Sequence, residues 1–153
     1  MKRDTAGRLA LALLVSGVLC LSLAAVASAA PTPGASVCQH GGWRTLFGPG
    51  TNAPLNFTNQ GACLKYARNG GAALGIRPSV SDGFAFFTVS GFGLMPSSPV
   101  TLLLISSGGG GQTFELVSPD GTIGFGFGPP CGSGVQGVAI GTTITTGQVQ
   151  AAC

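Results

Sequence analysis

Four side chains of this sequence have the chemistry needed for proton transfer: His40, Asp82, Glu115 and Asp120. Three of them lie in stretches that predict turns or the start of a segment, where solvated polar groups are ordinary. Glu115 stands between two apolar residues, and this alternation predicts that it lies on the outward face of a strand. The chain has no Gly-x-Ser-x-Gly elbow for a nucleophilic serine. We therefore expect no catalytic residue and a non-enzymatic protein.

His40 follows Cys38 by two residues, a spacing that suggests a pair of zinc ligands. A structural zinc site needs four ligands, and its cysteines must be thiolates. His40 is the one histidine of the chain, and cysteines of an exported protein are normally oxidised. We therefore expect neither a metal nor another cofactor.

The location of the protein is indicated by its first residues. Met1 to Arg8 is basic, Leu9 to Ala27 is apolar, and Ala27-Ser28-Ala29 offers small residues for a peptidase. This order is typical of a secretory signal peptide, which we place at residues 1–29. An uncleaved membrane anchor is the alternative, because roughly 20 apolar residues can span a bilayer. We expect a secreted protein, extracellular or in the cell envelope, that touches a membrane only through this segment if it is uncleaved.

The charge of the exported chain is small. After residue 29 the chain carries four basic and three acidic side chains, a net charge of +1. Nucleic-acid binding depends on a basic cluster that neutralises several phosphates, and no such cluster occurs. We therefore expect no nucleic-acid partner, and place the unknown partner in the envelope or outside the cell.

Four cysteines follow the predicted signal peptide: Cys38, Cys63, Cys131 and Cys153. An even number in an exported chain indicates two disulfides and no free thiol. Three connectivities are open, and we favour Cys38 with Cys63 and Cys131 with Cys153, because each pair lies within one compositional segment. Each bond would close a loop of roughly 25 residues and stabilise the fold by about 3 to 3.5 kcal/mol on the chain-entropy model.

The segment 30–77 predicts one short helix. Thr58-Asn59 offers capping oxygens, Gln60 to Arg68 has no β-branched residue, and Asn69-Gly70-Gly71 supplies a stop. The tract Pro31 to Ser36 is predicted to be a flexible lead-in. The sequence therefore predicts a small segment in which the helix is held by its disulfide.

The same segment contains a spaced set of cysteine, glycine and aromatic residues: Cys38, Gly41-Gly42-Trp43, Phe57, Asn59-Gln60-Gly61, Cys63 and Tyr66. Through these residues it resembles a module of short secreted bacterial proteins, over about 30 residues. The sequence departs from the module by the insert Phe47 to Asn56 and by Ala62, where an acidic residue is common. The resemblance implies export and a bond between the first two cysteines of the mature chain, and it implies no activity.

From Asp82 onward, apolar runs alternate with turn residues at the spacing of an antiparallel sandwich or barrel. In the run that begins at Thr122, Ile123, Phe125 and Phe127 share one face, which we expect to be the core. The predicted strands are Phe84 to Ser90, Val100 to Ser106, Gln112 to Val117, Thr122 to Phe127, Val135 to Ile140 and Thr143 to Ala151.

The last two runs predict a hairpin with Thr142 at the middle of its turn. In that register Cys131 faces Cys153, and Gly137 faces Gly147. A pair of facing glycines would permit a bulge or a sharp twist. The favoured disulfide would then close the open end of this hairpin.

The stretch 78–153 contains a glycine-interrupted run, Thr88 to Pro96, then the run Val100 to Ile105, and then a Ser-Pro-Asp-Gly turn within Val117 to Thr122. Through these residues the stretch resembles bacterial immunoglobulin-like domains, over roughly 70 residues. The fold class predicted is mainly β: a small antiparallel immunoglobulin-like sandwich, preceded by the disulfide-closed segment with its short helix. Such a fold does not by itself imply a function.

Two functions fit these features. The first is a non-enzymatic module that binds a partner through the sandwich surface, with Trp43 as a candidate surface contact. The second is a carrier of a small apolar ligand in a cleft lined by some of the nine phenylalanines. Trp43 is also expected to pack over the first disulfide and the helix, and the phenylalanines to form the core.

Overall fold

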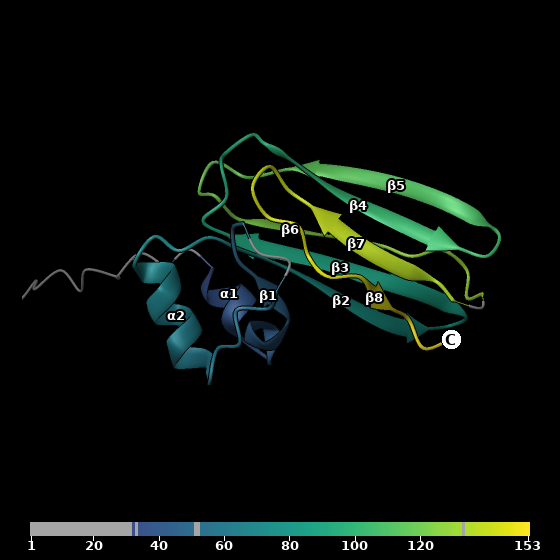
Figure 1. Cartoon of the computed structure of the whole chain (residues 1–153), viewed down its shortest axis with the longest axis horizontal. Coiled ribbons are helices and arrows are strands. Elements are labelled where there is room, and N and C mark those ends of the chain that lie inside the picture. The colour runs from purple at the N-terminus through teal and green to yellow at the C-terminus, as the bar shows by residue number, and fades with distance from the viewer. Residues whose placement is uncertain (1–31, 33, 51–52, 133) are drawn as a thin grey trace, which may run out of the picture. The chain divides into compact units, whose positions relative to one another are not determined.

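The computed structural model describes residues 32, 34–50, 53–132 and 134–153, so the predicted signal peptide lies outside the described residues. The mainly β fold predicted from the sequence is confirmed, because two antiparallel four-stranded sheets stack face to face (Figure 1). No helix in these described ranges is both long and apolar enough to cross a bilayer.

The first sheet has the strand order β1-β2-β3-β6, and the second has the order β5-β4-β7-β8. The strands of the first sheet are β1 (Leu46–Phe47), β2 (Ala73–Ser81), β3 (Phe84–Phe92) and β6 (Ile123–Phe127). The strands of the second are β4 (Pro99–Ser106), β5 (Gly109–Leu116), β7 (Gln136–Ile140) and β8 (Val149–Gln150).

The main core lies between the two sheets. Side chains at alternate positions of β3, including Phe87 and Val89, meet alternate side chains of β4, including Val100 and Leu102, and all four are buried. Because successive residues of a strand point to opposite faces, the alternate pattern of these runs places one set of side chains between the sheets. This packing is what holds the two sheets together.

Strand β2 is a correction to the sequence-based prediction, in which the strands begin at Asp82. Strands β2 and β3 form a hairpin of nine residue pairs, closed by Asp82 and Gly83 with φ of 51° and 79°. Positive φ at both central residues is the geometry of a type I′ turn, which suits the twist of paired strands. The boundary predicted between residues 77 and 78 therefore falls inside a strand, and Pro31–Cys153 forms one compact unit.

The predicted helix is confirmed as α2 (Gln60–Arg68), with the Asn59 side chain accepting a hydrogen bond from the Ala62 N–H at 2.9 Å. A second short helix, α1 (Ala35–Cys38), and a 3₁₀ turn, Gly42–Thr45, precede it, and α1 overlaps the tract Pro31 to Ser36, for which the sequence predicts a flexible lead-in. Figure 1 shows both helices beside the end of the first sheet that carries β1.

A second cluster of buried side chains joins these helices to the first sheet. It contains the disulfide-bonded Cys38 and Cys63, which are fully buried, together with Phe92 from the end of β3. Tyr66 of α2 packs against the cluster, its ring centroid 6.4 Å from that of Phe92, and its hydroxyl donates to the Ala72 carbonyl at 3.2 Å. The helical segment is therefore fixed to the sheet by the disulfide and by aromatic packing.

The register predicted for the last hairpin is wrong. Gly137 pairs with Val149 rather than with Gly147, and β8 is only two residues long. Thr146 is the cause: its N–H donates to the Ala139 carbonyl, and its hydroxyl accepts the Ala139 N–H, each at 2.9 Å. The Thr146 hydroxyl thus takes the place of the backbone carbonyl that would accept the Ala139 N–H in a regular ladder. As a result, the chain between Thr146 and β8 contains one residue more than a regular pairing would have.

Candidate functional site

The four candidate proton-transfer residues lie in separate elements. His40 precedes the 3₁₀ turn, Asp82 is in the β2–β3 turn, Glu115 is on β5, and Asp120 is in the link between β5 and β6. Within the part of the chain that the structure describes, no group of three or more His, Cys, Asp or Glu side chains could hold a metal ion. The arrangement offers no assembled acid–base pair.

Asp120 has a structural role in its turn. The Thr122 hydroxyl donates to Asp120 Oδ1 at 2.7 Å, and the Thr122 N–H donates to the same oxygen at 3.0 Å. These hydrogen bonds hold the pKa of Asp120 below its ordinary value, because they favour the charged form of the carboxyl group. The bond from the Thr122 hydroxyl has the largest effect. This carboxylate therefore fixes the link between the two sheets.

Glu115 lies on the opposite face from the one that its neighbours predict. It pairs with Val100, whose side chain points between the sheets, whereas Phe114 pairs with Thr101 and lies on the outer face. Opposite residues of an antiparallel pair share a face. Because β5 is at the edge of its sheet, the Glu115 side chain still reaches solvent. Its apolar neighbours Phe114 and Leu116 are exposed on the outer face.

Trp43 is half-buried and packs against the cluster that contains Cys38 and Cys63, as expected from the sequence for a structural residue. The Arg44 guanidinium carbon lies 4.8 Å from the ring centroid, within range of a cation–π contact. The disulfides are Cys38–Cys63 and Cys131–Cys153, the pairing that the sequence favours, with Cα–Cα distances of 5.9 and 5.7 Å.

The expectation that the phenylalanines form the core is only partly right. Three of them are buried, two are half-buried, and four are exposed. Phe127 is a correction: it pairs with the buried Phe87 and so points between the sheets, yet 48% of it is exposed. The exposed phenylalanines are Phe84, Phe86, Phe114 and Phe127.

The outer face of the second sheet is apolar across three strands. Phe114, which is 67% exposed, and Leu116 lie on β5, beside Leu103 and Ile105 of β4. The pairing of β4 with β7 adds Val138, opposite Leu103, and Ile140, opposite Thr101. We call these six apolar residues the outer apolar face. Its polar neighbours are uncharged threonine and glutamine side chains, and no described element packs over it.

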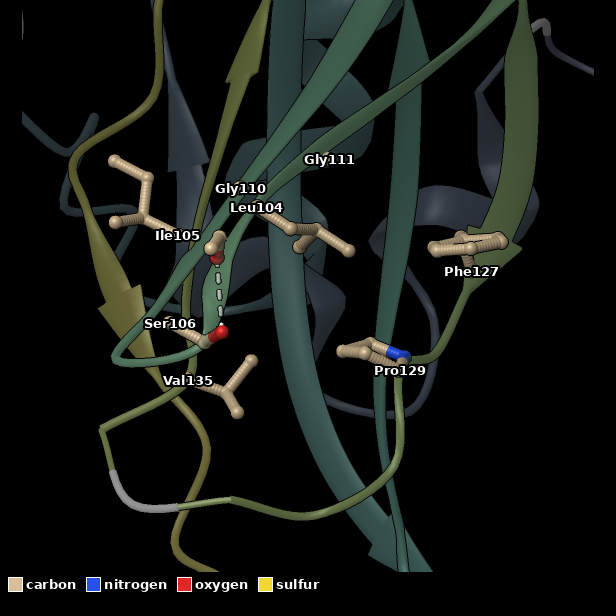
Figure 2. A pocket seen from close by; sticks show the side chains of 9 residues that line it. Leu104, Ile105, Ser106, Gly110, Gly111, Phe127, Pro129 and Val135 are labelled. Carbon is tan, nitrogen blue, oxygen red and sulfur yellow. Dashed lines mark hydrogen bonds between the residues drawn. The ribbon is translucent and has the colours of Figure 1, made fainter.

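A cleft opens between the sheets where β5 and β6 diverge. These consecutive strands are linked by residues 117–122, and the cleft lies at their far ends, with a volume of about 190 Å³. Figure 2 shows Leu104 and Val135 pointing into it from one side and Phe127 and Pro129 from the other. None of its lining residues is charged.

Glycines make this cleft. Gly109, Gly110 and Gly111 form the wall contributed by β5, and a Cβ placed on Gly111 would have no atom within 4 Å. Gly111 pairs with the buried Leu104, so a side chain at this position would enter the cleft. Glycine within a strand is unfavourable by roughly 0.5–1 kcal/mol relative to alanine and often marks close approach of a ligand or another backbone.

Sequence reasoning did not find this surface, although part of its signal is in the sequence. The run Val100 to Ile105 contains five apolar residues out of six, a pattern typical of a strand that is covered on both faces. The glycine run by itself predicts a turn. In the structure the turn is confined to Ser107–Gly108. Strand β5 therefore begins at Gly109, whereas the apolar pattern predicts a strand that begins at Gln112.

Comparisons of the chain with protein-family models, with curated proteins and with solved structures give no match.

Proposed function

We propose that this chain is a secreted or envelope-associated, non-enzymatic protein that works by binding a partner through the outer apolar face. The observation that carries the proposal is the set of six apolar side chains on the outer side of the second sheet, of which four are exposed and two are half-buried. Soluble monomers rarely expose contiguous apolar patches of large area, and such patches mark interaction sites. The proposal is also supported by the placement of the four candidate proton-transfer residues in separate elements.

The compartment in this proposal is supported by the two disulfides. Bonds of this kind form and persist outside the reducing cytosol. They join segments separated by 25 and 22 residues in a chain with few charged side chains. A protein stabilised in this way suits an extracellular or envelope setting.

Site-specific photo-crosslinking in the native cells tests the proposal. A photoreactive residue at Phe114 is expected to capture one defined partner, and a second substitution, Ile140→Lys, is expected to abolish that product, because it places a charge on the same face. The matched control carries the photoreactive group at Thr88, on the outer face of the first sheet. Equal products from both positions, or a product at Phe114 that Ile140→Lys leaves intact, would refute the proposal.

The cleft favours a second candidate, a carrier of a small apolar ligand. Its volume of about 190 Å³ is of the order of a cavity of 150 Å³ that binds benzene. One phenylalanine, Phe127, lines it, rather than several as the sequence predicts. Mass spectrometry of the protein purified from its native source under gentle conditions would detect a bound compound; a protein that carries none would count against this function.

A further inference from the structure

We propose that the cleft and the open edge of β5 together form a site for an extended peptide of the partner, which adds to β5 as a strand and inserts one bulky apolar side chain between Gly111 and Phe127. This inference rests on the proposed function and names the segment that the partner would use. Two independent observations lead to it: the length and character of the edge, and the position of the cleft beside it.

The edge of β5 is unusual among the four edges of the two sheets. The edge strands β1, β6 and β8 have two, five and two residues, whereas β5 has eight. Among the described strands, β5 pairs with β4 alone. Natural sheets protect long edges with lysine, proline, a bulge or an inward-pointing charge. Strand β5 contains no lysine and no proline, and its one charged residue, Glu115, lies at the opposite end of the strand from Gly111. Its backbone is therefore a template for an added strand.

The direction of the backbone groups follows from the register. The Val117 N–H donates to the Ser98 carbonyl at 3.0 Å, so odd-numbered residues of this strand face β4. Because antiparallel pairing alternates, the N–H and C=O groups of the even-numbered residues point to the open edge. These residues include Gly110 and Gln112, which flank Gly111. A peptide bonded to them would place a residue opposite Gly111.

That residue would direct its side chain into the cleft. Opposite residues in an antiparallel pair share a face, and the face of Gly111 is the one that contains Leu104 and opens toward Phe127. A volume of about 190 Å³ suits one aromatic or large aliphatic side chain. The uncharged lining excludes a charged side chain, because its burial would be unpaired. The chemistry of the cleft thus specifies a bulky, neutral side chain.

The same geometry disfavours the two other occupants. Pockets for drug-sized ligands usually have volumes of about 300–1,000 Å³, so this cleft could hold only a ligand about as small as benzene, and such a ligand would leave the edge of β5 unused. In a second copy of this chain, β5 would offer Gly109, Gly111, Thr113 and Glu115 on the face toward the cleft, and none of these is a bulky apolar residue. A partner peptide is the occupant that uses both the edge and the cleft.

Selection from a random peptide library tests the proposal. The protein used is purified from its native host, in the form that remains after any processing there. Selected peptides serve as probes in calorimetric titrations. We expect them to share one bulky apolar residue at a fixed position. Replacing that residue by alanine, or N-methylating alternate peptide residues, is expected to weaken binding at least roughly tenfold, because the first change empties the cleft and the second removes backbone donors.

Matched protein variants separate the two parts of the site. Gly111→Leu fills the cleft, and Gln112→Pro removes an edge-facing N–H; each is expected to weaken binding at least roughly tenfold. Gly124→Leu is the control, because Gly124 is also a strand glycine with open space around it and lies outside the cleft. It is expected to leave binding within roughly twofold. Circular dichroism and thermal unfolding confirm that each variant folds.

Several outcomes would overturn the proposal. Peptides that bind Gly111→Leu as tightly as the natural protein would show that the cleft is not used. Saturable binding of toluene that Gly111→Leu abolishes, with no peptide selected, would assign the cleft to a small ligand. Self-association that Gln112→Pro abolishes, with no peptide selected, would assign the edge to a second copy. If the library yields no binder while crosslinking at Phe114 still captures a partner, this inference fails and the proposed function stands.

Discussion

At the scale of single residues, Thr146 is the buried polar side chain that sets the end of the second sheet. Its hydroxyl is the acceptor for the Ala139 N–H. Thr146→Val keeps the shape and leaves that N–H without an acceptor, so we expect a loss of about 1–3 kcal/mol in the free energy of unfolding. Thr146→Ser keeps the hydroxyl and is expected to lose less. Urea unfolding measures both, and a valine variant as stable as the natural protein would contradict the assignment.

Asp120 makes a second residue-scale prediction, concerning pH. Its folded pKa is lowered, so its stabilising contribution is present above the unfolded value of about 3.9 and is lost as the pH falls through the folded value. NMR titration of the carboxyl carbon should give a midpoint below that of an unfolded peptide. Thr122→Val removes the hydroxyl donor and should raise the midpoint, whereas Thr113→Val should leave it unchanged. A midpoint insensitive to Thr122→Val would show that the hydroxyl does not lower the pKa.

Residue types alone gave the wrong face for Glu115. Alternation fixes that Glu115 and Phe114 lie on opposite faces, but it does not say which face is covered. The usual assumption is that the apolar set points to the core. On β5 the assumption fails, because the pairing with β4 puts Phe114 and Leu116 outside. Only the three-dimensional pairing reveals that this sheet has two apolar faces.

At the scale of elements, the start of α1 depends on Gly34. This buried residue has φ of 81°, and a Cβ on it would lie 2.6 Å from Phe92 Cβ. Gly34→Ala should lower the free energy of unfolding by about 2–4 kcal/mol, from backbone strain and from overpacking. Gly70→Ala is the control: its φ is 78°, but nothing lies within 4 Å, so we expect a loss of about 1–2 kcal/mol from strain alone. Thermal unfolding of both variants separates the cost of backbone strain from the cost of overpacking. Equal losses of stability in the two variants would exclude a packing role for Phe92.

Turn chemistry explains which elements the sequence predicts. The helix α2 was predicted at its observed bounds because Asn59 and Asn69-Gly70 mark its two ends. Strand β2 was missed because Gly75 and Pro78 lower its strand propensity. The signal that could have identified it is Asp82-Gly83, a strong hairpin indicator that implies a strand before it as well as after it. The cleft was beyond prediction, since it depends on how far β5 and β6 diverge.

At the scale of the whole molecule, the two disulfides should not contribute equally. Removing either restores chain entropy to the unfolded state, about 3 kcal/mol for loops of this length. Cys38 and Cys63 are fully buried, so replacing both by alanine also leaves a cavity in the second cluster, whereas Cys153 is exposed. We expect the Cys38→Ala, Cys63→Ala variant to be less stable than the Cys131→Ala, Cys153→Ala variant in urea. The reverse order would show that the second cluster adds little.

The β2–β3 hairpin also implies an order of events in folding. Its nine pairs and the eight pairs of β4 with β5 are local along the chain, each closed by a two-residue turn, while β1, β6 and β7 pair with these hairpins across longer stretches of chain. Local contacts form first because the loops that they close are short. We therefore expect the rate-limiting step to be the docking of these two hairpins through Phe87 and Leu102, with high φ-values there and low ones in α2 and β8. The helical segment and its disulfide would then close on a sheet that already exists.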